Sequence, residues 1–565
     1  MGAPGWSADD AGGAGLNHKT MLKSTPVGLN PGSVKRALNQ AVAGAAGMNR
    51  REMIGGMVSA SALVRATGWG AVAAACGSGT ALAQGAVDVV ERFGFVGDGR
   101  TDNYEAFHRL ADHASRTGGG SYVFPAGTYY VARHRERPYG FRDRRFVMNA
   151  EYLDCDRLTL SGYGAKIVLN GRFHRSGRRG TDGLTVGIHT AVFMPFEFRR
   201  CRNLTISGFE MDGGNARMTR DGPVTEGYSH LIALNSCSDV LLQDLDLHHG
   251  QVDGIYLSDD VANGGPTPGR ACRNIQLRNV KCRNNARGGL AVIQVFGLSA
   301  VECEFSGNGY PGGNYVYHPP GFGVDIEPDR AREGVDIDTK TGNLEFVRCN
   351  FYDNVSAILA AYSNSFKGYC RFIDCNTRNR QGDNHIIANW PGEGVLIEGG
   401  EHDAGPGCIY LSWQGQTGCR TTLRNLTIRS SNQFGLLHAF DGNLAVVEGC
   451  SLIGTHRTPN LGNFPFIAAN PGHGRRNVFA RNRIFLPAAS KDRSQAMDVG
   501  PNIHHTDLTG NEYSTDLAIR GEYFLAAFDP SCSVRNERFR GRFPGPQDTI
   551  RPTPDHDSRT PYSRP

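Results

Sequence analysis

Seven short segments of this chain repeat one pattern, and their spacing constrains the fold more than any other feature. Each is a run of aliphatic or β-branched residues whose second position is usually small, and successive segments lie 23 to 35 residues apart. A repeat of this length is typical of a solenoid or a propeller. A second strand of the type Cys201–Ile206 precedes most segments by about 15 to 20 residues, so two or three strands per turn predict an all-β fold, the right-handed parallel β-helix. The segments begin at Asp253, Gly288, Phe322, Ser356, Asn384, Gly407 and Phe434.

Alternation within the segments predicts which side chains face the core. One parity carries the apolar residues, so we expect a single buried column formed by Ile255, Leu290, Val324, Ile358, Ile386, Ile409 and Leu436. The intervening residues then point outward as a ladder, Tyr256, Ala291, Asp325, Leu359, Ile387 and Tyr410. A second outward ladder contains Glu327, two residues after Asp325.

Composition supports the solenoid and excludes some partners. The 74 glycines allow many sharp turns, because glycine takes positive φ without steric cost. A net charge of +5 is small for 565 residues, and no basic stripe is interleaved with aromatic residues, so we expect no nucleic-acid partner. No run of 18 apolar residues indicates an integral membrane segment. Nothing in the sequence decides whether the chain forms a homo-oligomer.

The fourteen cysteines recur near the starts of successive strands rather than in pairs. This placement is typical of a small inward-facing hydrophobe repeated in each coil, so a ladder of buried free thiols is favoured over a disulfide framework. Single bridges, Cys408 to Cys419 or Cys370 to Cys375, remain open alternatives. No zinc-like Cys-x-x-Cys pair occurs.

The first 83 residues are predicted to be a leader. Within 48–83, Arg50 and Arg51 precede a mildly apolar stretch and the small-x-small site Ala81-Leu82-Ala83, which indicates a twin-arginine signal peptide and a periplasmic or secreted protein. We expect a cap and first strand over 84–131, the β-helix over 132–485 and an irregular region over 486–542. The Pro- and Arg-rich tail, 543–565, is expected to be disordered.

The start of the predicted mature chain carries a recognisable motif. Gly97-Asp98-Gly99-Arg100-Thr101-Asp102-Asn103 precedes an amphipathic helix, and Phe124-Pro125-Ala126-Gly127-Thr128-Tyr129 follows it. This opening resembles that of the pectate-lyase-like superfamily of β-helix proteins, which includes polygalacturonases and phage tailspikes. The resemblance implies the fold and a helical cap over the first coil. We expect Asp98 and Asp102 to tie the turn and cap the helix rather than to act in catalysis.

Asp325 and Glu327 are the predicted catalytic acid and base. Residues i and i+2 on one strand have backbones about 6.6 Å apart, and inverting glycosidases hold their two carboxyls about 6.5 to 9.5 Å apart. Apolar neighbours and mutual repulsion would separate the two titrations, so that one carboxyl donates a proton while the other accepts one. The insertion 310–320 precedes this strand, and its Tyr317 and His318 are expected to wall a sugar site by stacking.

Asp253 is a third catalytic candidate. Gln251-Val252-Asp253-Gly254-Ile255 is similar to the Asn-Thr-Asp-Gly-Ile element of polygalacturonases, which implies that Asp253 matches one of their catalytic carboxylates. The other motifs of that family are absent, so a polygalacturonase is not expected. The element Gly323–Asp329 resembles the Gly-Ile-Asp-x-Glu-Pro element of a loosely characterised set of bacterial β-helix proteins, which implies a carbohydrate-active site.

Further residues are assigned to substrate binding or are excluded as metal ligands. Expected binding residues are Tyr256, Arg287, His385, Trp390, Tyr410 and Trp413, with Arg287 suited to a carboxylated sugar. No metal site is expected, because no acid falls at ligand spacing within the segment that carries His248 and His249.

The sequence therefore predicts an exported enzyme that cleaves a polysaccharide or oligosaccharide, an inverting glycoside hydrolase without a cofactor. One alternative is a polysaccharide lyase that acts on a uronate-containing polymer, with Ca²⁺ held by acids such as Asp259 and Asp260 and an Arg or Lys as the base. Another is a non-catalytic polysaccharide-binding or tailspike-like protein, for which the acidic ladder would be incidental.

Overall fold

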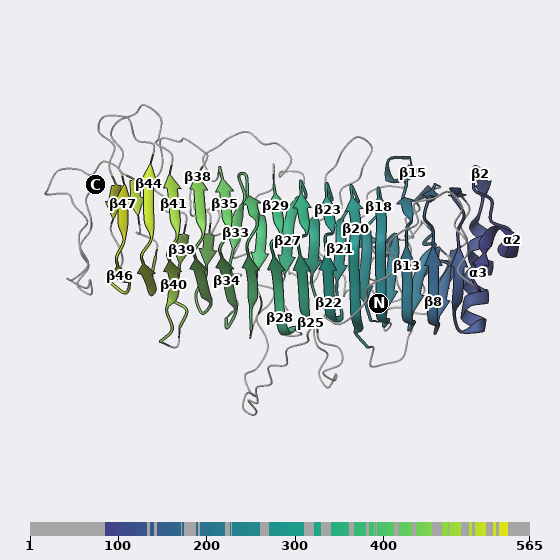
Figure 1. Ribbon diagram of the computed structural model, residues 1–565, viewed down its shortest axis with the longest axis horizontal. Helices are drawn as coiled ribbons and strands as arrows, with labels where there is room; N and C mark the ends of the chain where they lie inside the picture. Colours follow the sequence, from purple (N-terminus) through teal and green to yellow (C-terminus); the bar gives the residue numbers. More distant parts are fainter. Residues whose placement is uncertain are drawn as a thin grey trace, which may run out of the picture. The chain divides into compact units, whose positions relative to one another are not determined.

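Three parallel strands per coil form the framework of the protein. The computed structural model describes residues 85–540 with internal gaps, of which those of ten or more residues are 174–187, 260–269, 310–320, 329–340, 455–465 and 487–496. The leader 1–83 and the tail 543–565 lie outside the described residues. Strands of successive coils pair in parallel from one end of the stack to the other (Figure 1), which confirms the predicted right-handed parallel β-helix.

The strands form three columns, two of which merge at β18 and β20 into one 28-stranded sheet. The first column contains β1 (Val87–Asp88), β3 (Gly120–Val123), β8 (Asp156–Ser161), β13 (Arg202–Ser207), β18 (Ser238–His248), β20 (Cys272–Arg283), β22 (Val295–Val301), β25 (Thr341–Val347), β28 (Phe366–Ile373), β31 (Val395–Glu398), β34 (Arg420–Arg424), β37 (Leu444–Glu448), β40 (Asn477–Ala480), β43 (Thr506–Thr509) and β46 (Ser533–Arg535). The second column shares β18 and β20 and adds β2 (Asp98–Asp102), β4 (Gly127–Val131), β9 (Ala165–Leu169), β14 (Glu210–Asp212), β23 (Glu304–Ser306), β26 (Asn350–Tyr352), β29 (Asn376–Arg378), β32 (Glu401–Asp403), β35 (Thr427–Ser430), β38 (Ser451–Gly454), β41 (Arg483–Leu486), β44 (Glu512–Thr515) and β47 (Arg538–Arg540).

The third column is an 11-stranded sheet, and the seven repeated segments lie in it. Its strands are β7 (Glu151–Leu153), β12 (Phe196–Arg199), β17 (Ile232–Asn235), β19 (Asp253–Ser258), β21 (Gly288–Val292), β24 (Phe322–Ile326), β27 (Ser356–Ala360), β30 (Asn384–Ala388), β33 (Cys408–Tyr410), β36 (Leu437–Ala439) and β39 (Phe466–Ala468). Short pairs flank the columns: β5 (Glu136–Tyr139) with β6 (Arg144–Val147), β10 (Arg172–Phe173) with β15 (Thr219–Arg220), β11 (Ile188–His189) with β16 (Glu226–Gly227), and β42 (Met497–Val499) with β45 (Phe524–Ala526).

The coils continue beyond the predicted boundary at residue 485. Strands β43 and β44 pair with β40 and β41, and β46 and β47 pair with β43 and β44, so the stack reaches Arg540 where irregular chain was expected over 486–542. These last strands are short, and few apolar side chains of each are buried, such as Leu508 in β43 and Val534 in β46. A strand with so few apolar residues has no recognisable alternation in the sequence.

The register of the third column agrees with the predicted core column up to its last member. Ile255, Leu290, Val324, Ile358, Ile386 and Ile409 pair in turn, so both that column and the outward ladder are confirmed over this range. The next partner of Ile409 is Leu437 rather than Leu436, so that assignment was wrong by one residue. Two adjacent leucines gave the sequence no means of choosing between the two registers.

Close stacking explains the small second residue of the repeated segments. A Cβ built on Gly323 would lie 2.6 Å from the carbonyl oxygen of Ala357 in the next coil. Only glycine leaves room for that approach, because the inside of the corner is filled by the backbone of the following segment.

Cysteine side chains form ladders inside the coils. Every cysteine in the part of the chain that the structure describes is a free thiol, and all but Cys408 are buried. They donate to carbonyl groups of their own or neighbouring coils, as Cys201 Sγ does to Tyr152 O at 3.2 Å. Burial raises the pKa of Cys272 to about 12. The predicted thiol ladder is therefore confirmed, and neither alternative bridge is formed.

Buried asparagines link the corners of consecutive coils. Asn308 Oδ1 accepts a hydrogen bond from the backbone N–H of Asn285 at 3.0 Å, and Asn354 Oδ1 accepts one from that of Asn308 at 2.9 Å. Near the C-terminal end, Asn482 and Asn511 repeat the arrangement, and the carboxylate of Glu537 takes the next position.

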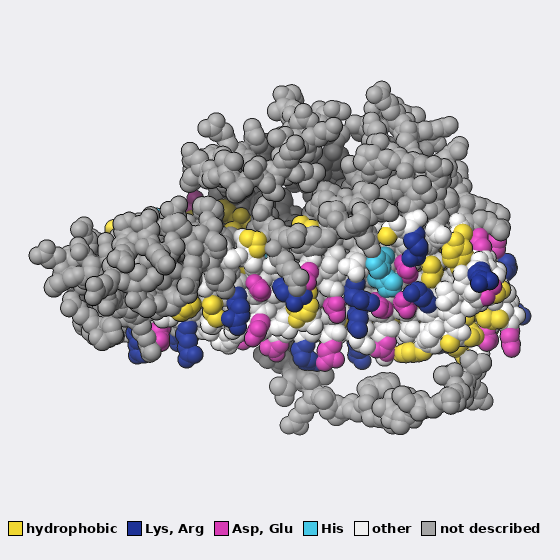
Figure 2. Space-filling view, turned by 90° about the horizontal axis from the view of Figure 1, so that it is seen from above, with side chains coloured by type: hydrophobic (Ala, Val, Ile, Leu, Met, Phe, Trp, Pro, Cys, Tyr) yellow, Lys and Arg dark blue, Asp and Glu magenta, His cyan; other side chains and the backbone are white. Residues whose placement is uncertain are grey.

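The surface of the coils carries charges of both signs. In Figure 2, basic and acidic side chains alternate over the described part of the face in view. This mixture is unlike the continuous basic stripe of a nucleic-acid-binding surface. Of the helices that the structure describes, none has the length and apolar character needed to cross a bilayer.

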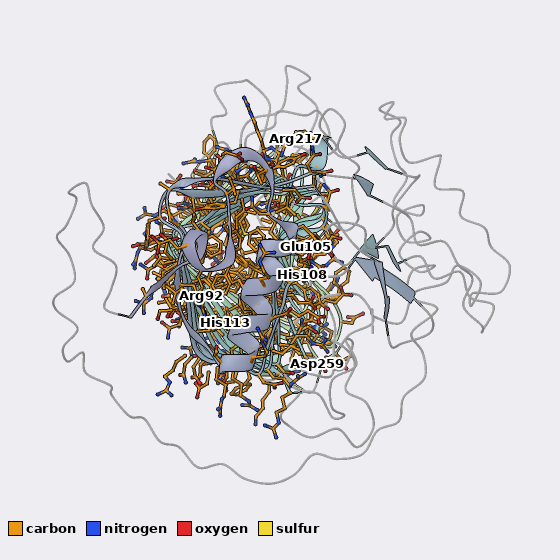
Figure 3. All side chains as sticks on the ribbon, turned by 90° about the vertical axis from the view of Figure 1, so that its right-hand side faces the viewer. Arg92, Glu105, His108, His113, Arg217 and Asp259 are labelled. Carbon is orange, nitrogen blue, oxygen red and sulfur yellow. The ribbon has the colours of Figure 1, made fainter. Side chains whose placement is uncertain are left out.

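A helical cap covers the first coil, as expected. Helix α2 (Val89–Phe93) leads into β2, and the longer α3 (Tyr104–Thr117) lies across the end of the stack, with the labelled residues Glu105, His108 and His113 along it (Figure 3). Its apolar face, which includes Phe107 and Leu110, is fully buried. A 3-10 helix, η2 (Asn215–Arg217), follows β14. Covering an open strand edge in this way prevents pairing with other chains.

The two aspartates of the N-terminal motif stabilise the turn before α3. Asp98 Oδ1 accepts the backbone N–H groups of Arg100 and Thr101 at 2.8 and 2.7 Å, and these bonds lower the pKa of Asp98 to about 2. Asp102 Oδ1 accepts the N–H of Tyr104, the first helical residue. The contacts match the structural role that the sequence predicts for both residues.

We predict that Asn308→Ala destabilises the protein, because it removes the four hydrogen bonds of the Asn308 side chain and leaves the backbone N–H of Asn285 and the carbonyl oxygen of Cys282 without these partners. Each orphaned buried group costs about 1–3 kcal/mol. Urea unfolding followed by circular dichroism measures the change, with the exposed Gln276→Ala as a control expected within about 0.5 kcal/mol of the parent chain. Equal losses in the two variants would contradict a stabilising role for the ladder.

Candidate functional site

Asp325 is a carboxylic acid held in the middle of a strand of the third column. Val324 and Ile326 on either side of it are buried in the core, so the pleat turns the Asp325 side chain outward, between Ala291 of β21 and Leu359 of β27. Asp325 is nevertheless only 2% exposed, and within the described part of the chain nothing makes a hydrogen bond to its Oδ1. A buried polar atom without a partner costs stability, so this carboxyl contributes little to holding the fold together.

The surroundings of Asp325 favour its neutral form. Burial raises the pKa of Asp325 well above its usual range, and the negative charge of Glu327 raises it further. The nearby guanidinium of Arg287 opposes this effect, while Asp253 adds to it. These surroundings therefore favour the protonated form of Asp325, which is the form that can donate a proton.

Glu327 follows Asp325 at the end of the same strand. Its backbone N–H donates to Val292 O at 3.2 Å, which extends the parallel register one step beyond β24. In contrast to Asp325, Glu327 is an exposed residue. The two carboxyls thus stand at alternate positions of one strand in different environments, one dry and one in contact with solvent.

Asp253 belongs to a buried ion-pair cluster two coils away. Arg287 donates from Nε to Oδ1 at 2.9 Å and from Nη2 to Oδ2 at 2.5 Å, and His230 Nδ1 lies 3.1 Å from Oδ2. The ring of His230 also stacks on that of Tyr256 at 4.3 Å between centroids. Burial acts to raise the pKa of Asp253, but the charge of Arg287 and the contact with His230 outweigh it and hold the pKa well below its usual range.

The pKa values of two buried carboxyls in one part of the third column are therefore driven in opposite directions. Asp253 holds Arg287, whereas Asp325 lacks a hydrogen-bond partner on Oδ1 among the described residues. Neighbouring groups whose pKa values are driven apart are characteristic of acid–base sites. The bidentate contact also engages the side chain of Arg287, which was expected to bind substrate.

His230 is a member of this cluster that the sequence did not identify. It precedes β17, whose strand pairs with β19, and the N–H of the next residue, Leu231, donates to Asp253 O at 3.1 Å. Its position is 23 residues before Asp253, within the range of the repeat. The segment carries Leu231 at the second position, which is small in six of the seven repeated segments, and for that reason it was not recognised as an equivalent strand.

Two expected substrate-binding residues lie in the core instead. His385 is completely buried, and its Nε2 lies 2.5 Å from Thr377 Oγ1, which also contacts His402 Nδ1 at 3.0 Å. Trp390 is also fully buried, where its ring stacks on Phe366 and its Nε1 donates to Gly368 O. The assignment of His385 failed because this residue takes the corner position that is a small residue in the other six repeated segments, and this position points inward.

The remaining substrate-binding candidates are Tyr410, which the structure describes, and three residues that lie outside the described part of the chain. Tyr410 stands on the outward ladder, is half-buried, and stacks on Phe440 with 6.0 Å between ring centroids. Tyr317, His318 and Trp413 lie outside the described residues. Their assignment to substrate binding stays a prediction.

One group with metal-binding potential occurs among the residues that the structure describes. Asp212, His248 and His249 present ligand atoms that all lie within 4.8 Å of one another. The prediction from the sequence took into account only the segment that carries the two histidines, and that segment has no acid at the spacing of a metal ligand. The acid comes from the preceding coil, because the register pairs Asp212 with His248.

No protein-family model and no curated protein matches the chain. Among solved structures it is similar to PfbA, a surface adhesin of Streptococcus pneumoniae, with 14% identity, coverage of 78% of this chain and 92% of that chain, and a TM-score of 0.42. It is also similar to the A-module of the Azotobacter vinelandii mannuronan C-5 epimerase AlgE6, with 14% identity, coverage of 80% and 99%, and a TM-score of 0.35. A third is the tailspike protein gp49 of Acinetobacter baumannii bacteriophage Fri1, a capsular polysaccharide depolymerase, with 12% identity, coverage of 83% and 65%, and a TM-score of 0.32. At these values the similarities do not indicate what this chain binds or cleaves.

Acidification is expected to destabilise the core around His385. Burial, with His402 as a smaller cause, lowers the pKa of His385 to about 3, and burial lowers that of His402 to about 4. Both titrate near pH 6.5 in the unfolded chain, which therefore binds protons that the folded chain excludes. Stability is lost as the pH falls from about 6.5 toward 4, by about 1.4 kcal/mol per histidine and pH unit.

Urea unfolding at pH 7 and pH 5 tests this dependence in the parent chain and in His385→Gln. The variant should lose less stability on acidification, and the comparison cancels the other titrating groups. The partly exposed His113→Gln is the matched control and should keep the parent's dependence. If His385→Gln and the parent respond equally, the buried imidazole is not the cause.

Proposed function

We propose that this chain is a carbohydrate-active enzyme, an inverting glycoside hydrolase in which Asp325 is the general acid and Glu327 the general base. The observation that supports it best is the burial of the neutral Asp325 carboxyl, without a hydrogen-bond partner on Oδ1 among the described residues, beside an exposed carboxyl on the same strand. Burial beside a second carboxyl favours the protonated form of a carboxylic acid. Without a hydrogen bond to Oδ1, this group contributes little to the stability of the fold.

The proposed reaction moves one proton at each carboxyl. Asp325 donates its proton to the glycosidic oxygen as the bond to the anomeric carbon breaks. Glu327 accepts a proton from the water that attacks the anomeric carbon from the opposite face. The backbones of alternate strand residues are about 6.6 Å apart, within the range of about 6.5–9.5 Å that leaves room for this water. Exchange with solvent then restores both protonation states.

Asp253 is a positioning residue in this proposal rather than a third catalytic acid. It is ionised and held by Arg287 and His230, so it has no proton to donate. Its negative charge helps to keep Asp325 protonated, and its contact with Arg287 keeps that cation in place. Export through the predicted leader would bring such an enzyme to an extracellular polysaccharide.

The hydrolase, the lyase and the binding protein are separated by one set of assays. The purified protein is incubated with a panel of bacterial and plant polysaccharides, while reducing ends and ultraviolet absorbance are followed. New reducing ends without absorbance support hydrolysis, and NMR of the first product should show the inverted anomer. Absorbance from an unsaturated uronate supports the lyase, and binding without cleavage supports the binding protein.

We predict that Asp325→Asn and Glu327→Gln each lower turnover by about 10² to 10⁴, the range for a positioned proton-transfer group. Neither side chain is part of the apolar core, so circular dichroism and thermal unfolding should show an intact fold. Glu345→Gln, on β25 in the other sheet, is the matched control and should keep parental turnover. Wild-type turnover in both site variants on a verified substrate would exclude this assignment.

Asp253→Asn is expected to change the pH dependence of turnover. Turnover by a general acid falls as the pH rises through its pKa, and Asp253 is one cause of the raised pKa of Asp325. Removing that charge while Arg287 stays should shift the alkaline limb of the pH–rate profile to lower pH. A purely structural role for Asp253 would lower the amount of folded enzyme and leave the limb where it is.

A further inference from the structure

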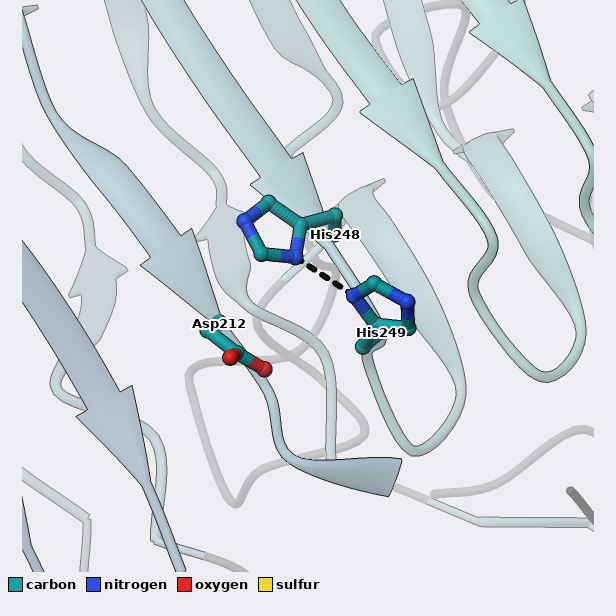
Figure 4. Close-up of side chains that lie close together, drawn as sticks. All are labelled: Asp212, His248 and His249. Atoms are coloured by element: carbon teal, nitrogen blue, oxygen red, sulfur yellow. Dashed lines mark hydrogen bonds between the residues drawn. The ribbon is translucent and has the colours of Figure 1, made fainter. Parts of the chain in front are cut away.

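Three side chains that the proposed reaction does not use meet where β14 and β18 end. Asp212 is the last residue of β14, His248 is the last residue of β18, and the register pairs the two directly. His249 follows and turns back toward the same point, so that the two imidazole rings and the carboxylate converge (Figure 4). Asp212 and His248 are each only 8% exposed.

The hydrogen bonds of His248 fix where its proton lies. Its Nε2 is 3.2 Å from Glu210 Oε1, and a carboxylate only accepts, so Nε2 carries the hydrogen. The Nδ1 of His248 then has a lone pair, and His249 Nδ1 donates to it across 2.6 Å. A histidine whose outer nitrogen donates to a carboxylate while its inner nitrogen faces other ligands has the arrangement found at metal centres.

We propose that Asp212, His248 and His249 bind a divalent transition-metal ion, with Zn²⁺ as the reference case, and that Glu210 orients His248 from behind. The metal takes the place of the hydrogen between the two Nδ1 atoms, and the proton of His249 moves to its Nε2, so no net proton is released. Two imidazoles and one carboxylate suit Zn²⁺ and similar ions, whereas Ca²⁺ prefers oxygen ligands alone.

The two nitrogen ligands require only a small adjustment. Zn–N bonds of about 2.0–2.1 Å in a tetrahedral site place two nitrogen ligands about 3.3 Å apart. The two Nδ1 atoms, now 2.6 Å apart, would therefore separate by less than about 1 Å. Three protein ligands leave at least one coordination position for water.

The backbone around the group is held by bonds between coils. Gly213 N donates to His248 O at 2.8 Å and Asn215 N to His249 O at 2.9 Å, while His249 itself takes a left-handed φ of 56°. Such a conformation in a non-glycine residue persists only where the surroundings hold it. These contacts place both histidines against the preceding coil before any ion arrives.

Arg217 is a described neighbour that opposes a metal. Its Nη1 lies 3.0 Å from Asp212 Oδ2, and its positive charge competes with a cation for that carboxylate. The Arg217 side chain is 47% exposed, so it can turn into solvent. Arg217→Gln should therefore strengthen the binding of the metal ion. If the group were only an arginine–aspartate ion pair, this substitution would not create stronger metal binding.

Isothermal titration of the full chain, without an affinity tag and after treatment with a chelator, tests the proposal with Zn²⁺. One equivalent is expected to bind and to raise the melting temperature, because an ion that binds only the folded state stabilises it. His248→Ala should weaken this binding at least 100-fold. Glu210→Gln should weaken it 10- to 100-fold, as for other outer partners of ligating histidines. His504→Ala, in a distant coil, is the control.

The absorption spectrum of the Co²⁺-loaded protein separates this group from the cysteines. Histidine and carboxylate ligands give only weak visible bands, whereas a thiolate gives an intense charge-transfer band in the near ultraviolet. Weak bands that disappear in Asp212→Asn and in His248→Ala, with the fold retained by circular dichroism, support the site. A thiolate band, or Zn²⁺ affinity that both variants keep unchanged, overturns it. Neither readout depends on polysaccharide cleavage.

Discussion

Parallel backbone hydrogen bonding between successive coils is the constraint on which the rest of this structure depends. It places each residue directly beside its counterpart in the next coil, about 4.8 Å away. The contacts that a side chain can make therefore depend on the residues before and after it in the same ladder. Asparagines at the corners donate to and accept from one another through this repetition, and thiols, rings and aliphatic groups stack for the same reason.

The candidate acid site is an exception within one of these ladders. The neighbour of Asp325 in the preceding coil is the buried Ala291, which deprives a carboxyl of water without offering it a hydrogen bond. Two coils earlier, the Asp253 carboxyl is equally buried but is fully engaged by Arg287 and His230. The same fold thus raises the pKa of one carboxyl and lowers that of another, and the difference comes from which ladder neighbours are charged.

Much of the fold could be predicted from the sequence, because local alternation is the same in every coil. The outward ladder from Tyr256 to Tyr410 was anticipated residue by residue, and the helical cap was anticipated as an element. The predictions failed at positions where the alternation of apolar and polar residues does not reveal the register or the direction of a side chain. Leu436 and Leu437 are equally apolar, His385 sits at a corner where parity changes, and the last coils have few buried apolar residues.

The site was only half predictable for a related reason. Asp325 and Glu327 share one strand, so their relation can be seen within a few residues of sequence. His230 joins Asp253 from one coil earlier, and Asp212 joins His248 across 36 positions. Such pairings require the exact length of each coil, and the insertions between strands vary that length from one coil to the next.

The ladders of free cysteines determine the redox conditions under which this chain can fold correctly. Once the coils have closed, the described thiols other than that of Cys408 are buried, and burial raises the pKa of thiols such as those of Cys272 and Cys370, which protects them from oxidants and disulfides. Before closure, the same thiols are exposed on a flexible chain and can cross-link in many wrong combinations. Folding in an oxidising medium would therefore lead to wrong disulfides, and refolding of the purified chain would require a reductant.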